Sequence, residues 1–437
     1  MSDEILIYSE TRNSRTDYIF SYLLSDLLGL KMNQTQSLDD ANAFEGPVIY
    51  YTNLNLTGKL CIRPTGLLGE TDIKGRSIET GVWDGLTVLF SDNPEYPVPF
   101  DIFSASFWLL SRYEEYLDYS HDAHGRFPAR ESLAFRAGFL DLPVVNLWTI
   151  KLASVIRRYY PALKTKKNKF HWITTIDIDH AWAFRNKGRY RVWGGLAASF
   201  FRGKDFKKRI SVLKGDEPDP FFTFDAIREI HREFPEKLLL FTLSGKPAKY
   251  DPNSATDNPE WRALFSGLAT DYQLGMHPSY RSNQGIHILK SEFDTLRELL
   301  PYPLKNSRQH FLKLKLPETY TNLINLGIQN DYSMGYPGQP GFRAGVCTPF
   351  YFYDLKKEQR TSLRIWPFTL MDRTLKDYLH KVPEESMDII NTYIDIVEKA
   401  GGWFIPVWHN DSLSDYAEWE GWKNVYVQML ETLKSKS

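Results

Sequence analysis

The stretch WITTIDIDHAW (residues 172–182) places two carboxylates at the end of an apolar run. Its apolar and β-branched residues predict a buried strand, and side chains two positions apart on a strand point to the same side. We therefore expect Asp177 and Asp179 to face one space. Two carboxylates placed in this way repel each other unless a cation compensates their charge. The stretch thus predicts a cation site at the end of a strand.

Other apolar runs of the chain end in residues that suit such a site. YQLGMH ends in His277, and GWFIPVWH ends in His409. Active sites of parallel α/β folds lie at the carboxyl ends of the strands, so we expect these side chains on one rim. A catalytic zinc takes about three protein ligands and a water, and Asp179 and His277 supply two of them. Asp177 is then free to accept a proton from a water that the metal activates.

Each of these residues also has an ordinary structural interpretation. A single Asp at a strand end often caps a helix or forms a turn. His277 precedes a Pro and a Ser, where a hydrogen-bonded structural histidine is common, and His409 in VWHND can cap a loop. The pairing of Asp177 with Asp179 on one face favours the functional interpretation, and His409 gains weight only from these neighbours.

Apolar runs and helical patterns alternate through the second half of the chain. We expect strands within residues 170–177, 237–244, 272–277, 344–353 and 402–409, and helices within 223–234 and 385–400. Strands that alternate with helices and are apolar on both faces indicate an α/β fold with a parallel sheet, either a barrel or a doubly wound sheet. The polar residues 249–261 predict a surface loop near the mouth of the site.

The first part of the chain has a different pattern. It predicts short strands within residues 4–9 and 46–52 and helices within 104–117 and 142–160. The charged run KTKKNK (164–169) has no apolar face and is interpreted as a boundary. We expect an N-terminal α/β domain over residues 1–165 and a second domain over residues 168–437, and no motif indicates the role of the first.

Composition narrows the possible partners and the compartment. A formal net charge of -1 gives no electrostatic reason to expect nucleic acid, and the basic stretch FFRGKDFKKR (200–209) is interpreted as a solvated helix face rather than an anion site. Cys61 and Cys347 are the only cysteines, which excludes a disulfide framework and favours a reducing compartment. Because there is neither a secretory signal nor an apolar run of roughly 20 residues, we expect a soluble cytoplasmic protein without a membrane span.

The segments TTIDIDH, HPSYRS, SRQHF and VWHN, in this order, resemble motifs of the polysaccharide deacetylase family, carbohydrate esterase family four. The resemblance covers residues 168–437 and implies a distorted (β/α) barrel that deacetylates N-acetylated sugars with a divalent metal. TTIDIDH resembles an Asp-x-Asp variant of the first motif, which implies Asp177 as the base and Asp179 as a metal ligand. The chain also resembles a Bacteroides-type group of such proteins with an extra N-terminal domain.

Two positions depart from the pattern of this family. In the second motif His277 matches the first histidine, but Arg281 stands where a second histidine belongs. A guanidinium stays protonated and is no ordinary metal ligand, so the usual ligand set is incomplete. In SRQHF the resemblance implies that Arg308 holds the base, and His310 replaces a proline. His310 is thus a candidate third ligand, with a substrate-binding or structural role as the alternative.

The last two motifs concern an acid and a histidine. The acid-bearing fourth motif is matched by Asp331 in QNDY, and we group Asp331 with Arg281 and His310 as candidate substrate-binding residues. The final motif is an apolar pair followed by histidine. VWH fits it, which implies that His409 is the general acid that protonates the leaving amine.

The sequence leaves more than one class of function open. The first is a zinc-dependent hydrolase that cleaves the amide of an N-acetylated sugar or polysaccharide precursor. The second is a non-catalytic carbohydrate-binding protein on a degenerate barrel, with Arg281 binding an anionic substituent. A third keeps catalysis but gives Arg281 the task of recognising the acid group of a uronic or sialic-type sugar.

Overall fold

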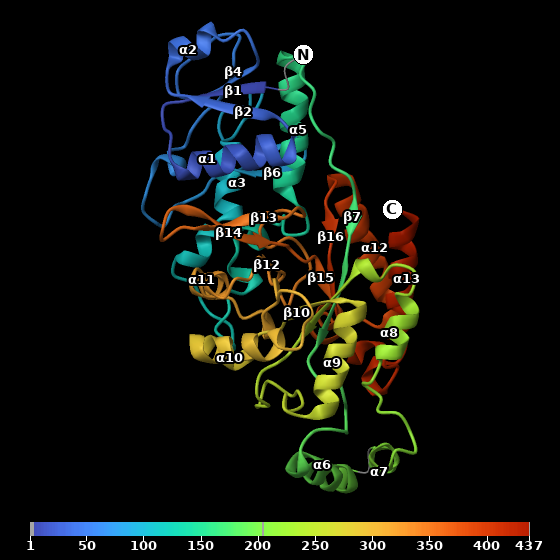
Figure 1. The fold of residues 1–437 in the computed structure, drawn as a ribbon. Helices are drawn as coiled ribbons and strands as arrows, with labels where there is room; N and C mark the ends of the chain where they lie inside the picture. Colours follow the sequence, from blue (N-terminus) through green and yellow to red (C-terminus); the bar gives the residue numbers. More distant parts are fainter. Residues whose placement is uncertain (1–3, 203–204, 437) are drawn as a thin grey trace.

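A nine-stranded sheet lies at the centre of the computed structural model, which describes residues 4–202 and 205–436 (Figure 1). Its order is β13-β14-β12-β11-β10-β9-β8-β17-β15. The strands are β8 (Thr174–Ile178), β9 (Leu238–Thr242), β10 (Gln273–Met276), β11 (Asn306–Ser307), β12 (Asn330–Asp331), β13 (Phe350–Asp354), β14 (Gln359–Ile365), β15 (Leu370–Met371) and β17 (Pro406–His409). All neighbours are parallel except β13 and β14, so the carboxyl ends of the parallel strands share one edge.

Helices alternate with these strands along the chain, which confirms the predicted α/β class. They are α8 (Phe224–Ile230), α9 (Pro259–Asp271), α10 (Ile286–Arg297), α11 (Glu318–Asn325), α12 (Pro383–Ala400) and α13 (Trp422–Ser435). Every residue of β8, β9 and β17 is buried, as their continuous apolar runs indicated. Among the described strands no pairing joins β13 to β15. The sheet is therefore open, and the finer expectation of a distorted barrel stays a prediction.

The expected strand within residues 344–353 is wrong in extent and direction. β13 begins only at Phe350. It runs antiparallel to β14 because a tight turn connects the two strands directly, and in this turn the Lys357 amide donates to the Asp354 carbonyl (3.2 Å). β14 itself escaped prediction, since its sequence QRTSLRI is largely polar and exposed.

The N-terminal part of the chain forms a separate parallel sheet in the order β2-β1-β3-β4. Its strands are β1 (Glu4–Ser9), β2 (Lys31–Thr35), β3 (Val48–Tyr51) and β4 (Leu60–Ile62), and a hairpin of β5 (Thr80–Trp83) and β6 (Leu86–Leu89) follows. The helices are α1 (Ser14–Phe20), α2 (Leu38–Ala43), α3 (Ile102–Leu110), α4 (Leu133–Arg136) and α5 (Val144–Tyr159). The predicted helix over 104–117 is therefore split, because α3 ends at Leu110 and a short 3-10 helix covers Tyr113–Tyr116.

One hydrophobic core joins this N-terminal part to the central sheet. It runs from Ile5 to Leu163 and continues through residues of 276–365. The ring of Tyr353 on β13 lies 5.0 Å from that of Tyr18 and 5.1 Å from that of Phe107, measured between centroids. The N-terminal part is thus packed against the β13–β14 edge of the sheet, and the proposed division into domains at residues 165–168 stays a prediction.

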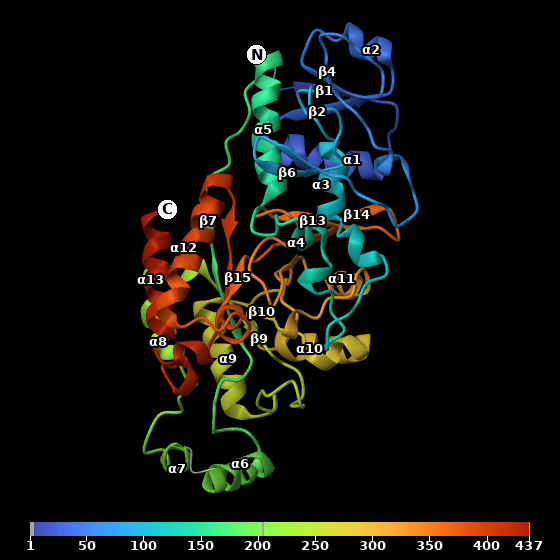
Figure 2. The same ribbon diagram turned by 180° about the vertical axis from the view of Figure 1, so that it is seen from behind.

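Several elements lie outside these two sheets. β7 (His171–Trp172) pairs with β16 (Trp403–Phe404), and α6 (Arg189–Arg202) and α7 (Phe206–Lys214) stand away from the body (Figures 1 and 2). Short 3-10 helices cover Leu67–Gly69, Ala129–Glu131, Pro235–Lys237, Tyr280–Gln284, His310–Leu312, Asp411–Leu413 and Ala417–Trp419, and π-helical segments cover Ser21–Leu27 and Thr374–Tyr378. Within the described ranges, none of the helices has both the length and the apolar character that crossing a membrane requires.

Candidate metal centre

Adjacent strands of the central sheet bring the predicted acids and imidazoles together at its carboxyl edge. Asp177 lies at the end of β8 and Asp179 directly after it, while His277 follows β10. His310 comes three residues after β11, and His409 ends β17. Because these strands are neighbours or next neighbours in the sheet, their ends converge on one pocket.

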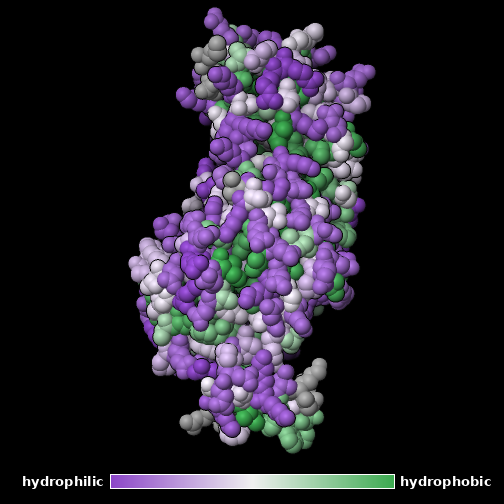
Figure 3. Space-filling view, turned by 90° about the vertical axis from the view of Figure 1, so that its right-hand side faces the viewer, coloured by the Kyte–Doolittle hydropathy of each residue, from purple (hydrophilic) through white to green (hydrophobic). Residues whose placement is uncertain are grey.

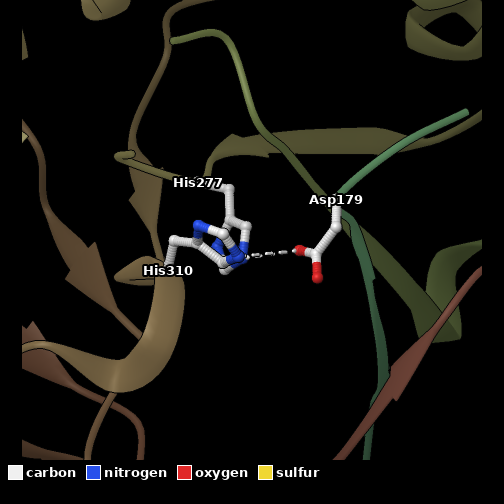
Figure 4. A group of neighbouring side chains, drawn as sticks. All are labelled: Asp179, His277 and His310. Carbon is white, nitrogen blue, oxygen red and sulfur yellow. Dashed lines mark ion pairs between the residues drawn. The ribbon is translucent and has the colours of Figure 1, made fainter. Parts of the chain in front are cut away.

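Three of these side chains form a buried cluster that fits a metal ion (Figure 4). Asp179 Oδ1 lies 3.3 Å from His277 Nε2 and 3.5 Å from His310 Nε2. Ligand atoms held about 2.0–2.1 Å from a tetrahedral zinc are separated by about 3.3 Å, so the spacing suits zinc. Asp179 Oδ1 and His277 Nε2 are buried and have no hydrogen-bond partner, and a cation would satisfy both atoms.

The second nitrogen of each imidazole is fixed by a hydrogen bond. His277 Nδ1 donates to the backbone carbonyl of Arg308 (2.6 Å), and His310 Nδ1 donates to the Asp251 carboxylate (3.0 Å). With the proton on Nδ1, each Nε2 presents its lone pair to the cluster, which is the tautomer that a metal ligand needs. The two rings lie close together and aim these atoms at Asp179 (Figure 4).

The cluster favours positive charge at its centre. Burial acts to raise the pKa of Asp179, but His310 and His277 stabilise the carboxylate and hold its pKa well below the usual value. Burial likewise opposes protonation of His310, yet Asp179 and Asp251 raise its pKa to about 9. A divalent metal supplies the same positive charge without that proton, so metal binding and release of the proton would be coupled.

Asp177 is held beside this cluster by a buried arginine. Arg308 Nη1 donates to Asp177 Oδ1 (2.8 Å) and lies 2.8 Å from Thr175 Oγ1, while its Nε donates to the carbonyl of Tyr332 (3.0 Å). The other carboxylate oxygen, Asp177 Oδ2, lies 3.7 Å from His277 Nε2. Arg308 therefore fixes the carboxylate so that Oδ2 faces the cluster.

His409 approaches the same pocket from β17. Its Nδ1 lies 2.8 Å from Asp372 Oδ1, and its backbone amide donates to Asp372 Oδ2 (2.8 Å). Burial acts to lower the pKa of His409, but Asp372 outweighs it and raises the pKa to about 9. His409 is thus a protonated imidazole at neutral pH, oriented by a carboxylate in the way of a catalytic histidine.

The pocket around these residues has a volume of about 470 Å³, within the usual range for small-molecule sites. Aromatic rings of Tyr250, Phe311 and Tyr378 line its wall. The N-terminal part contributes Arg126, whose Nε donates to Asp122 (2.6 Å) and whose Nη1 donates to the carbonyl of Phe311 (2.7 Å). Residues on both sides of the proposed domain boundary therefore build one pocket.

Two of the predicted substrate-binding residues do not reach this pocket. Arg281 is exposed on the 3-10 helix Tyr280–Gln284, a turn that the Ser279 hydroxyl caps by accepting from the Ser282 amide. Asp331 is buried on β12 and accepts hydrogen bonds from the Ser333 amide (2.9 Å) and hydroxyl (3.0 Å). Neither residue lines the pocket. His310, the third candidate, lines the pocket and lies in the cluster that could hold a metal ion, as its alternative role of third ligand implied.

Sequence reasoning missed the two carboxylates that orient the imidazoles. Asp251 lies in the polar stretch 249–261, which we interpreted as a surface loop, but Asp251 and Asn253 are buried. The loop does reach the pocket, through Lys249, Tyr250 and Pro252. Asp372 directly follows the two-residue strand β15. In TLMD an acid again comes after apolar residues, which is the same signal that identified Asp177. That strand was too short to be noticed.

The fold and the cluster together define an α/β protein with a two-histidine, one-carboxylate centre at the carboxyl edge of a mainly parallel sheet. A family of unknown function, DUF7033, matches residues 5–161, roughly a third of the chain. No curated protein matches the sequence.

Three solved structures show distant similarity to this chain. A protein described as a polysaccharide deacetylase, from Mycobacterium smegmatis, has a TM-score of 0.41 at 11% identity, covering 61% of this chain and 85% of its own. The Puue allantoinase has a TM-score of 0.40 at 12% identity, covering 73% of this chain and 92% of its own. A 7,8-dihydropteroate synthase from Vibrio fischeri ES114 has a TM-score of 0.27 at 8% identity, covering 63% and 98%. Similarity at this level does not establish a shared fold, so the function is argued from the site itself.

Proposed function

We propose that the chain is a metal-dependent hydrolase that cleaves the amide of an N-acetylated sugar or polysaccharide precursor. The observation that carries this proposal is the convergence of three ligand atoms, from Asp179, His277 and His310, on one point in a pocket. The same pocket receives Asp177, a carboxylate with one oxygen facing the cluster, and His409, a protonated imidazole. A metal site with an adjacent base and acid suits hydrolysis of an amide.

The residues of the cluster would hold the metal through Asp179 Oδ1 and the two Nε2 atoms. We propose zinc because one carboxylate and two imidazoles are common zinc ligands and leave a position for water. When bound, the metal supplies Lewis-acid chemistry that polarises the amide carbonyl and makes water a better nucleophile. Elemental analysis of protein purified without chelator tests this directly, since two histidines and a carboxylate also suit iron.

The residues of the chain then divide the proton transfers between them. Asp177 accepts a proton from the attacking water through Oδ2, because Arg308 Nη1 occupies Oδ1 and leaves Oδ2 facing the cluster. His409 donates a proton from Nε2 to the leaving amine, because Asp372 holds its Nδ1. These roles match those that the sequence resemblance implied for Asp177, Arg308 and His409.

The lining of the pocket supports a carbohydrate substrate. The rings of Tyr250, Phe311 and Tyr378 give it apolar walls, while Arg126 and Gln309 offer polar groups for orientation. Aromatic walls of this kind suit the apolar faces of sugar rings. The particular sugar, the zinc and a cytoplasmic location belong to the proposal.

The test compares two Asp→Asn variants in the same pocket. Asp177→Asn should lower the rate of acetate release from N-acetylated sugars by at least about a hundredfold, because it removes the general base. Its metal content should stay at that of the wild type, because Asp177 is not in the cluster. The control is Asp377→Asn, since Asp377 lines the pocket but is exposed and pairs with Lys376 at the rim. It should change the rate by less than about threefold.

Three results would count against the proposal. An unchanged rate in Asp177→Asn rejects its role as the base. Metal-free wild-type protein rejects the centre, and metal-loaded protein without activity on any N-acetylated sugar rejects the substrate class. The alternative of a non-catalytic sugar-binding protein relied on Arg281, and the exposed position of Arg281 outside the pocket gives that alternative no support.

A further inference from the structure

The segment between β8 and α8 forms a hairpin of two helices that projects from the body (Figures 1 and 2). We call residues 185–214 the α6–α7 hairpin, of which the structure describes all but residues 203–204. Its helices contact each other, and α7 also contacts the body through Arg209, whose guanidinium lies 4.4 Å from the ring centroid of Phe184. Lys208 lies 4.4 Å from the ring centroid of Tyr416. The start of the hairpin is attached too, since Asn186 Nδ2 donates to Glu260 (3.0 Å) and Lys187 Nζ donates to the carbonyl of Pro252 (3.0 Å).

The outward face of α6 is apolar. Trp193, Phe200 and Phe201 are 72%, 64% and 86% exposed, and with exposed Ala197 they occupy positions i, i+4, i+7 and i+8 of one helix face. The opposite face packs on α7, since Ser199 is buried and accepts a hydrogen bond from Arg209 Nε (3.1 Å). Figure 3 shows apolar surface at this projecting end among hydrophilic atoms. An amphipathic helix normally buries such a face, so this one lacks its partner.

Positive charge is concentrated on the same hairpin. Residues 185–214 contain ten Lys and Arg residues and one Asp, a net charge of +9. Because the whole chain has a formal net charge of -1, the other 407 residues together carry -10. A negatively charged surface would therefore attract the hairpin and repel the rest of the molecule, which orients the approach.

We propose that the α6–α7 hairpin docks on an anionic lipid surface. A helix with exposed Trp and Phe on one face and Lys and Arg around it lies in the plane of a bilayer interface, with its rings at the boundary between headgroups and acyl chains. The basic residues meet the lipid phosphates, which supplies the charge complementarity. This mode of binding needs no membrane-crossing helix.

The arrangement of the rings favours lipid over nucleic acid. Single-stranded nucleic acid binds rings whose faces are free to stack with bases. Here Phe200 contacts Phe201 and Phe206 edge to face, with centroid distances of 5.8 Å and 5.3 Å, so the rings form one apolar cluster. Such a cluster inserts into a bilayer as a unit.

Docking would also orient the candidate metal centre. The hairpin leaves the sheet after the carboxyl end of β8, the strand that carries Asp177 and precedes Asp179. The same end of the sheet holds the pocket. An attached hairpin thus turns the pocket end of the sheet toward the bilayer. The docking itself depends only on the hairpin and not on the proposed hydrolase activity.

The experiment is sedimentation of the full chain with lipid vesicles. We expect binding to vesicles of phosphatidylcholine mixed with phosphatidylglycerol, and at least about tenfold weaker binding to pure phosphatidylcholine or at high salt. The triple variant Trp193→Ser, Phe200→Ser, Phe201→Ser should bind the anionic vesicles at least about tenfold more weakly than the wild type, since its apolar face is gone. The control Phe135→Ser removes an exposed ring of α4, far from the hairpin in sequence, and should bind as the wild type does.

Several outcomes would overturn the proposal. Absence of binding to the anionic vesicles rejects it, and so does equal binding by the triple variant and the wild type. Tighter binding to single-stranded RNA than to vesicles would assign the hairpin to nucleic acid. If the wild type is a dimer, and the triple variant is a monomer that binds vesicles as tightly as the wild type does, the apolar face belongs to an interface with a second copy. Circular dichroism and metal content of the triple variant should equal those of the wild type, because Trp193, Phe200 and Phe201 belong to none of the hydrophobic cores of the body.

Discussion

Two clusters of buried charged residues in this molecule differ in whether all of their buried polar atoms have hydrogen-bond partners. Arg112, Glu114, Glu115 and Arg343 lie between the N-terminal part and the central sheet, with two positive and two negative charges. Glu115 accepts from Arg343 Nε (2.9 Å) and Nη2 (2.7 Å) and from Arg112 Nε (2.7 Å). None of the side-chain nitrogen and oxygen atoms of these four residues is buried without a partner.

The cluster at Asp179, His277 and His310 is different because it contains atoms that nothing in the described chain satisfies. Asp179 Oδ1 and His277 Nε2 are buried without a hydrogen-bond partner, and the second nitrogen of each imidazole is already engaged. Burial and a shifted pKa do not distinguish the two clusters. In the first cluster Arg343 and Arg112 also lower the pKa of Glu115, against the effect of burial. The unsatisfied ligand atoms, rather than the buried charge, therefore mark the functional centre.

The largest expected effect follows from removing a ligand of the cluster. Asp179→Ala leaves two neutral imidazoles to hold a cation, so we expect the metal content to fall from one atom per chain to less than about a tenth. Hydrolysis should be lost with the metal. Elemental analysis after gel filtration measures the first, and acetate release measures the second. Retention of one metal per chain in Asp179→Ala would show that the metal lies elsewhere.

The opposite result is expected for the satisfied cluster. Glu115→Gln leaves Arg112 and Arg343 buried with a single carboxylate, which should lower the free energy of unfolding by about 3–5 kcal/mol. Urea unfolding followed by circular dichroism measures this change, and the metal content should stay at that of the wild type. The double variant Glu115→Gln, Arg343→Met should recover part of the lost stability, since it removes the arginine that Glu115→Gln leaves without a carboxylate. A loss of metal in Glu115→Gln would undo the distinction between the clusters.

Four residues of the site could be found from the sequence because each of their strand ends carries its own local signal, whereas His310 was indicated only by the family resemblance. An acid or imidazole directly after a buried apolar run identified Asp177, Asp179, His277 and His409, and parallel pairing then brought them together. The same signal could not determine whether the sheet closes, because closure depends on the register of strands only two residues long. The open order from β13 to β15 came from the structure alone.

Contacts between distant parts of the chain left no such signal. The bond from His310 to Asp251 joins residues 59 apart, and Arg126 reaches the pocket from the N-terminal part. Asp251 lies in a stretch whose polar composition indicates exposure, although its carboxylate is buried. The resemblance also placed Arg281 at a ligand position, while the local chain turns it into solvent. Buried polar residues in loops are determined by tertiary contacts, which a single sequence does not reveal.

The next prediction concerns pH and separates His409 from the ligands. Because Asp372 raises the pKa of His409 to about 9, the imidazole keeps its proton at lower pH and loses it as the pH rises through about 9. The rate should therefore fall above pH 9 in the wild type. Asp372→Asn removes the carboxylate and should lower the pKa of His409 by about one to three units, which moves the alkaline limb to lower pH. Rate profiles of the wild type, Asp372→Asn and Asp377→Asn measure the shift, and only Asp372→Asn should show it. An unmoved limb in Asp372→Asn would remove His409 from the role of proton donor.

The smallest effect is expected where the cluster is held by a second carboxylate. Asp251→Asn keeps an oxygen that can accept from His310 Nδ1 but removes the negative charge behind the ring. We expect the affinity for zinc to fall by about 10- to 100-fold, because outer-shell partners of a metal-bound histidine usually contribute that much. Competition with a chelator of known affinity measures it. The control is Asp257→Asn, an exposed acid of the same loop, which should leave the affinity unchanged.

His277 offers no comparable variant, since its Nδ1 partner is the backbone carbonyl of Arg308. The order of effects, with Asp179 above Asp251 and Asp251 above Asp257, therefore separates a residue that binds the metal from one that orients a ligand and from one that merely lies nearby. Complete loss of metal in Asp251→Asn would instead make Asp251 a ligand itself, and an affinity equal to that of Asp257→Asn would leave His310 outside the centre.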